Sequence, residues 1–191
     1  QEVSDYLLKA KAFNRNGNPE RSVEILTEAL NKLQDHRLFL ERADANILKA
    51  DHSGAIADFN AANTLLPLSG EFGLARVYAI KGDAATSVYH LELSMKSDFK
   101  RSEKEIMLDP AFGKIENRTE WRHFWKKNWY SLSEESLSEI EYYSSAGKIE
   151  EASSLLNELR KNYPDNETTR YAESLVDISA GRYTAAVKTL T

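Results

Sequence analysis

The sequence predicts an all-α fold, arranged as a right-handed superhelical stack of antiparallel helix hairpins. The main observation is a recurring turn in which a glycine and a polar or charged residue precede small and apolar residues at helical spacing. It occurs at Gly82, Gly147 and Gly181, and the last two are 34 residues apart. A period of this length is typical of one helical hairpin repeated along the chain, each copy burying its apolar face on its neighbours. We therefore expect an α-solenoid.

The first hairpin is expected to turn at residues 17–20. Pro19 suits the first turn of the following helix, where its missing N–H has no intrahelical partner to lose. Small and apolar residues recur on one face before the turn at Tyr6, Ala10 and Phe13, and after it at Ser22, Ile25, Leu26, Ala29 and Leu30.

The second and third hairpins repeat this pattern with small residues on both helices. Helices that pack closely need Ala, Gly or Ser at the crossing, with larger partner side chains filling the space around it. The second hairpin carries this face at Phe39, Arg42, Ala43, Ala45, Ala55, Ile56, Phe59 and Ala62. The third carries it at Leu74, Ala75, Tyr78, Ser87, Val88, Leu91 and Ser94.

The spacing then becomes irregular. The step from Ser87 to Ala152 is 65 residues, almost two periods, yet the expected middle hairpin is missing. In its place are an Asp-Pro-x-Phe step at 109–112 and an aromatic helix that Asn117 or Thr119 could cap. The sequence thus predicts three repeats over 1–97, a capping or linker insertion over 98–131, and two more repeats over 132–191, the last truncated.

Two segments make the resemblance to a known family specific. Residues 48–62, and residues 145–152 with the Asn-Tyr-Pro-Asp that follows at 162–165, resemble the tetratricopeptide repeat, a 34-residue helical hairpin. Asn46 departs from that pattern, because the family usually has Tyr at this position. The resemblance implies a scaffold that binds a protein or peptide in the concave groove of the array. A structural spacer, or a regulatory domain of a larger multidomain protein, is the alternative.

The phase of the repeats also predicts which side chains face the groove. They come from the first helix of each hairpin and include both charges and large apolar groups, a mixture suited to peptides. The expected groove residues are Lys11, Leu40, Asp44, Phe72, Arg76, Leu137, Glu141 and Tyr171.

Three tryptophans, Trp121, Trp125 and Trp129, are predicted to share one helix, where a spacing of four gives a slanting stripe. The stripe either seals the third repeat or leaves one ring exposed as a binding anchor. Basic residues flank it, as in some single-strand nucleic-acid sites. The net charge of -5 argues against a nucleic-acid partner.

No constellation of residues suggests catalysis. The chain has no cysteine, its four histidines have no second ligand at metal spacing, and it contains no glycine-rich phosphate loop. We expect no enzyme activity, no metal and no cofactor. No apolar run approaches the 18 residues of a transmembrane helix, so no membrane span is expected.

Both ends suggest a piece of a longer protein. Gln1 leads directly into a helical pattern, which fits a cleaved signal and a location outside the cytoplasm, although a cytoplasmic location is equally compatible. The last helix carries Ala185, Ala186, Val187 and Leu190 without a stop signal. We expect its apolar face to be covered by further repeats or by self-association with a second copy.

Overall fold

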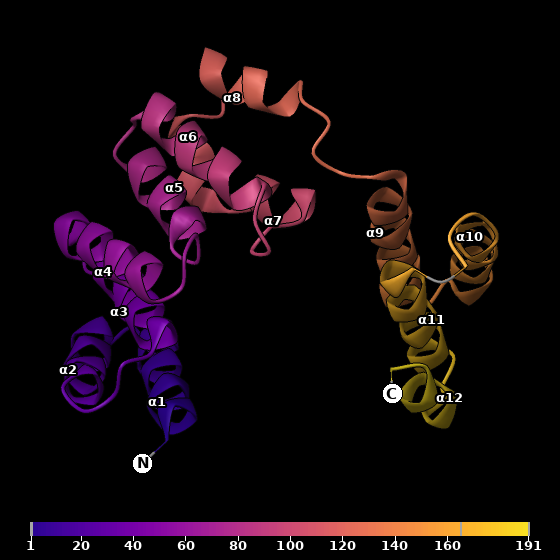
Figure 1. Cartoon of the computed structure of the whole chain (residues 1–191), viewed down its shortest axis with the longest axis horizontal. Coiled ribbons are helices and arrows are strands. Elements are labelled where there is room, and N and C mark those ends of the chain that lie inside the picture. Colours follow the sequence, from indigo (N-terminus) through magenta and orange to yellow (C-terminus); the bar gives the residue numbers. More distant parts are fainter. Residues whose placement is uncertain (1, 165, 191) are drawn as a thin grey trace. The chain divides into compact units, whose positions relative to one another are not determined.

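The computed structural model describes residues 2–164 and 166–190, with the side chain of Leu190 outside the description. These residues form α-helices and one 3-10 helix without a strand, which confirms the all-α prediction (Figure 1). The first helices are α1 (Val3–Arg15), α2 (Pro19–Leu30), α3 (His36–Leu48), α4 (His52–Leu65), α5 (Glu71–Ile80) and α6 (Ala84–Met95). They are followed by α7 (Glu103–Met107), η1 (Pro110–Lys114), α8 (Thr119–Trp125), α9 (Leu132–Ser145), α10 (Ile149–Asn162), α11 (Glu167–Ser179) and α12 (Tyr183–Leu190).

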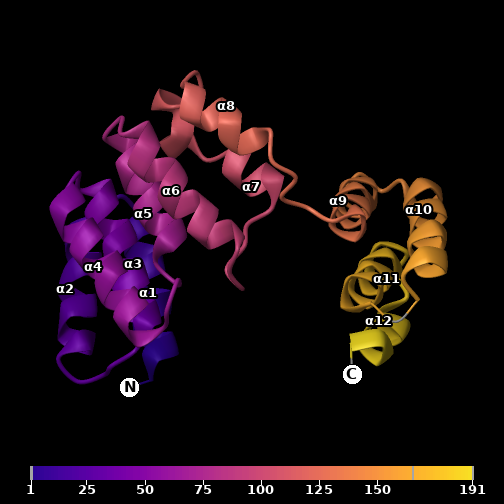
Figure 2. The ribbon, with the colours of Figure 1, turned by 45° about the horizontal axis from the view of Figure 1, so that its top comes forward.

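The chain divides into two compact units, Gln1–Lys127 and Asn128–Thr191. Within the first unit, α1 packs on α2, α3 on α4 and α5 on α6, while α3 also contacts both α1 and α5. Within the second unit, α9 packs on α10 and α11 on α12, and α9 also contacts α11 (Figure 2). In both units, therefore, both helices of each hairpin contact the first helix of the next hairpin, since α2 packs on α3, α4 on α5 and α10 on α11 as well.

Five turns that join the two helices of a hairpin contain the same type of backbone hydrogen bond. The donor is the N–H of the second residue after the C-cap of the first helix, and the acceptor is the carbonyl oxygen of the third residue before that C-cap. The donor and acceptor N···O distances are 2.7–2.9 Å for Asn18 to Phe13, Asp51 to Asn46, Asp83 to Tyr78, Lys148 to Tyr143 and Arg182 to Asp177. This bond is typical of helix ends closed by a residue with positive φ. That residue is Gly17, Ala50, Gly82, Gly147 or Gly181, with φ between 58° and 81°.

The fifth residue after each of these turn residues is small and buried. Its exposure is 0% at four of the turns and 3% at the last, for Ser22, Ala55, Ser87, Ala152 and Ala186. Each second helix therefore approaches its partner through a side chain that leaves room for a larger neighbour. Each repeated turn is thus followed by a small buried residue at the same distance along the chain.

Helices α4 and α5 approach each other closely at Gly73. A Cβ built on Gly73 would lie 2.1 Å from the Phe59 ring, and Phe59 is 2% exposed. Any larger residue at Gly73 would displace that ring from the core cluster it forms with Ala43, Ala55 and Leu74. Glycine is required here for space rather than for backbone freedom.

The predicted insertion, 98–131, holds three short helices. Of these, η1 packs on α5 and α8 packs on α6, within the first compact unit. Their apolar side chains are buried, with exposures of 8% or less at Ile106, Ala111, Phe112, Ile115, Trp121 and Phe124. The segment thus adds core to the third hairpin.

Two details predicted for the aromatic helix are wrong. The three tryptophans do not share it, because α8 ends at Trp125 and Trp129 lies beyond it. Its N-cap is Arg118, which makes no side-chain capping hydrogen bond, rather than Asn117 or Thr119. The next helix, α9, begins after Ser131, which forms a capping box and has an extended backbone with ψ 162°.

The final helix, α12, packs on α11 through Ala186, whereas Val187 is 63% exposed. Ala185 is also exposed. The burial of Leu190 lies outside the described residues. The prediction that something beyond this sequence covers the apolar face of α12 remains a prediction.

Candidate functional site

The first unit contains a cavity of about 330 Å³ lined by the first helix of each of its three hairpins. Most of its lining residues are polar or charged; they come from α1 and α3, and α5 contributes one arginine. The lining residues are Lys11, Asn14, Arg15, Glu41, Asp44, Ile47, Leu48 and Arg76. The volume is in the lower part of the range typical of ligand pockets.

Arg76 holds the carboxylates on one side of the cavity. Its Nη1 donates to Asp44 Oδ1 at 2.8 Å, and its Nε lies 2.8 Å from Asp109 Oδ2. Asp109 precedes η1 and also accepts a hydrogen bond from the backbone N–H of Ala111 at 2.9 Å. Arg76 therefore ties α3, α5 and the start of η1 together beside the cavity.

The opposite side is organised by Asn14. Its Nδ2 donates to Glu41 Oε1 at 3.0 Å, and Lys11 Nζ lies 4.0 Å from the other oxygen of Glu41. The Asn14 Oδ1 atom is buried and has no hydrogen-bond partner among the described residues. A buried acceptor without a partner is costly unless a donor reaches it.

Both cavity carboxyls have raised pKa values. Burial is the main cause of the rise in the pKa of Glu41, and the neighbouring Asp44 carboxylate adds to it. Surrounding protein likewise raises the pKa of Asp44, against the opposing effect of the Arg76 guanidinium, although 47% of the Asp44 side chain is exposed. The cavity is therefore a place where negative charge is poorly solvated.

Three of the predicted groove residues of the first unit, Lys11, Asp44 and Arg76, line this cavity. Leu40 and Phe72 do not. Leu40 is partly buried against the core cluster around Phe59. Phe72 contacts the Phe112 ring at 6.0 Å and lies under the Arg101 guanidinium at 5.0 Å.

The predicted groove residues of the second unit serve different roles. Leu137 packs against the core cluster around Ile140. Glu141 is exposed on α9, and Tyr171 is 44% exposed on α11. None of the three lines the cavity described above.

The tryptophans are mostly covered. Trp121 is 5% exposed and stacks on Phe112 at 5.1 Å, while Trp125 is half-buried and contacts Phe124 edge to face. Trp129 is half-buried in the second unit. Trp121 thus has a core role, which fits the sealing alternative for this ring, and a binding anchor at Trp125 or Trp129 remains a prediction.

Five of the lining residues were not predicted from the sequence. They lie at helical spacing from residues that were predicted: Asn14 and Arg15 follow Lys11 by three and four positions, and Glu41, Ile47 and Leu48 are three or four positions from Asp44. Positions three and four apart share a helix face. Extending each predicted residue along its own face would have found all five.

Within residues 2–164 and 166–190, no group of three or more His, Cys, Asp or Glu side chains is placed to hold a metal ion. None of the described helices is long and apolar enough to cross a membrane. No protein-family model matches the sequence, and no curated protein matches it significantly.

Proposed function

We propose that the chain is a tetratricopeptide-like scaffold that binds a peptide segment of another protein in the cavity between α1, α3 and α5. The observation that carries the proposal is that Lys11, Asp44 and Arg76, on three successive hairpins, line one cavity. The turns that repeat at Gly17, Ala50 and Gly82 support it, because the same hairpin turn occurs three times in the first unit and α3 contacts both α1 and α5.

The polar groups of the cavity suit a peptide backbone and its charged side chains. Lys11 is 56% exposed in its side chain, and Arg15 is exposed, so both have donors available for peptide carbonyls or carboxylates. The partner is therefore an extended peptide whose carbonyl or carboxylate groups are held by these donors.

A display library of random dodecapeptides tests this proposal. We expect panning against the chain to enrich a common motif. Lys11→Ala and Arg15→Ala should each weaken the enriched peptides about fivefold, which is the loss of a moderate interface contact. Lys9→Ala is the matched control, because Lys9 is an exposed α1 lysine that does not line the cavity. Failure to enrich a motif, or an equal loss in the control, would contradict the proposal.

The alternative function is a structural spacer or regulatory domain without a ligand of its own. The contacts of Arg76 with Asp44 and Asp109 favour it, since these groove charges already join three elements of the fold. In that case Arg76→Ala lowers the thermal midpoint while no library peptide binds. A peptide that competes at Lys11 and Arg15 would rule this alternative out.

A further inference from the structure

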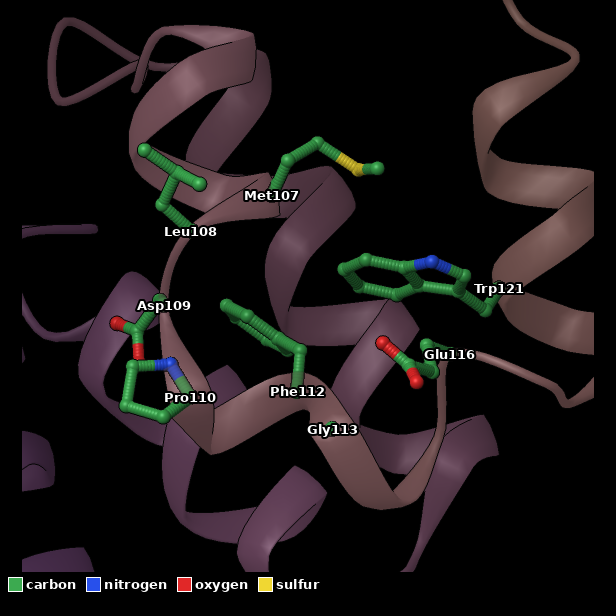
Figure 3. Close-up of a pocket in the computed structure, with 8 residues that line it drawn as sticks. All are labelled: Met107, Leu108, Asp109, Pro110, Phe112, Gly113, Glu116 and Trp121. Atoms are coloured by element: carbon green, nitrogen blue, oxygen red, sulfur yellow. The ribbon is translucent and has the colours of Figure 1, made fainter.

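A second pocket lies in the segment that follows the third hairpin. Its volume is about 140 Å³, and it is formed by the end of α7, by η1 and by the first turn of α8. The residues that line it are Met107, Leu108, Asp109, Pro110, Phe112, Gly113, Glu116 and Trp121 (Figure 3). A pocket of this size can take one side chain, whereas drug-sized ligands need several hundred Å³.

Most of the residues that line the pocket are apolar. Met107 is 55% exposed and Leu108 is 70% exposed, although both are large hydrophobic residues. The stacked rings of Phe112 and Trp121 lie across from Met107 in the view of Figure 3. Exposed apolar side chains beside a cavity are typical of a contact surface for another protein, and methionine adapts its shape to what it contacts.

The charged groups of the pocket are both acidic. Asp109 is already engaged, because its carboxylate lies 2.8 Å from Arg76 Nε and accepts a hydrogen bond from the Ala111 N–H. Glu116 is exposed, and its side chain has no hydrogen bond or ion pair within the described part of the chain. Figure 3 shows it beside the two aromatic rings. One carboxylate is therefore available to a guest.

The apolar residues and the Glu116 carboxylate together determine which kind of side chain can bind in the pocket. A purely apolar side chain would fill the pocket but would remove water from the Glu116 carboxylate without replacing it. An acidic guest would be repelled. Lysine and arginine carry a long apolar stem that ends in a cation, so the stem can lie on an apolar wall while the charge stays at the rim.

We propose that this pocket binds the side chain of a lysine or arginine from a partner polypeptide. The stem packs against Met107, Leu108 and the edges of the Phe112 and Trp121 rings, and the cation pairs with Glu116. The site is separate in its lining from the cavity between α1, α3 and α5. It needs no occupant in that cavity.

The two methionines of the chain allow a direct test. With ¹³C-methyl-methionine labelling, Met107 reports on the pocket, and Met95, which is 4% exposed on α6 and does not line it, is the internal reference. The probes are N-acetyl-lysine amide, N-acetyl-arginine amide and N-acetyl-norleucine amide. We expect the two basic probes to shift the Met107 signal saturably, with a Kd of about 1–10 mM, which is usual for one small side chain. The Met95 signal should stay in place.

The charge of Glu116 is tested by substitution. Glu116→Gln should weaken both basic probes about two- to fivefold, as expected for an exposed ion pair, and leave the norleucine probe unchanged. Glu158→Gln makes the same charge change on α10, at an exposed residue of the second unit, and should have no effect.

Several outcomes would overturn the proposal: norleucine binding as well as lysine, a Met107 signal that does not saturate, or equal basic-probe affinities in Glu116→Gln and the unsubstituted chain. These outcomes are independent of the peptide library, because the probes do not require the Lys11 and Arg15 donors. A chain that enriches no peptide yet shows the Met107 titration would lose the proposed groove function and keep this pocket.

Discussion

Ala50 has the least favourable backbone of the five repeated turns. Its φ is 58°, in the left-handed region, where the other four turns have glycine. A Cβ in this conformation costs roughly 1–2 kcal/mol because it approaches the following carbonyl oxygen. The turn forms nevertheless, with a 2.8 Å hydrogen bond from Asp51 N to Asn46 O. The surrounding packing therefore imposes the turn on an unsuitable residue.

Ala50→Gly is predicted to stabilise the fold by about 0.5–1 kcal/mol, since relief of the left-handed Cβ exceeds the extra backbone entropy of glycine in the unfolded chain. Gly82→Ala, at φ 81°, is the opposite change at an equivalent turn and should cost about 1–2 kcal/mol. Urea denaturation midpoints measure both. The prediction requires a higher midpoint for Ala50→Gly than for Gly82→Ala. If the two variants had the same midpoint, the turns at Ala50 and Gly82 would not be equivalent.

Asn46 is a buried polar residue with a defined structural role. It is 6% exposed on α3, and its Nδ2 donates to Asp58 Oδ2 at 3.1 Å. Arg42 donates to both oxygens of the same carboxylate, at 2.9 and 2.6 Å. The Asn46 amide thus fills a further acceptor site of a buried carboxylate on α4, which would be costly to leave unpaired.

The raised pKa of Glu41 predicts a pH dependence of stability. Glu41 is 11% exposed in its side chain, and burial raises its pKa. As the pH rises past the unfolded carboxyl pKa of about 4.3, the unfolded chain releases this proton first, so stability falls until the folded pKa is passed. Glu41→Gln should remove that fall and raise the thermal midpoint at pH 7. Near pH ~3.5 the two chains should have almost equal midpoints.

The control for this pH series is Glu158→Gln, because Glu158 is exposed. Its midpoint should follow the unsubstituted chain at every pH. A Glu41→Gln chain that is less stable at pH 7 would mean that the contacts of Glu41 with Asn14 and Lys11 outweigh the cost of its burial.

At the scale of single helices, apolar periodicity is the decisive information in the sequence. The periodicity assigned five residues to the inner face of the second helix. Four of them are buried, namely Ser22, Leu26, Ala29 and Leu30, and the fifth, Ile25, packs beside them. Apolar periodicity predicts burial because a helix that packs against its neighbours on one side buries the residues along one stripe of its surface. Helix ends depended on local capping instead, and the Ser131 capping box was the missed signal that separates α8 from α9.

Ala152→Leu tests the packing of α10 on α9. Ala152 is 0% exposed within the cluster formed by Ile140, Leu156 and Val176, so extra methylenes should overpack it and cost about 1–3 kcal/mol. Ala185→Leu is the control, because Ala185 is exposed on α12. Chemical denaturation compares the two. An unchanged midpoint for Ala152→Leu would mean that the helices can separate freely at this crossing.

At the scale of the whole molecule, the division into two units predicts a single preferred protease site. Lys126 and Lys127 are exposed between α8 and α9, where the chain leaves one unit and enters the other. Trypsin should cut there first, since cleavage elsewhere in a helix needs local unfolding. Mass spectrometry of brief digests should find fragments ending at these residues, and Lys126→Gln with Lys127→Gln should remove them. Early cleavage within α1–α6 would contradict this.

The sequence alone determined the helical class, the positions of the repeated turns and the buried faces. Each of these depends on residues within one or two helical turns of each other, so spacing along the chain contains the information. Gly17, Gly82, Gly147 and Gly181 all adopt the positive φ that a helix-ending glycine predicts. Lys11, Asp44 and Arg76 were placed on the correct helices for the same reason.

Only the tertiary structure decided which of those side chains meet. Leu40 and Leu137 have the spacing of groove residues, but both pack against core clusters, because neighbouring helices set how far each helix is rotated. The pairing of Arg76 with Asp44 and Asp109 joins residues 32 and 33 positions apart in the chain. No local pattern encodes such contacts. They follow from helix packing, which balances the burial of many side chains at once.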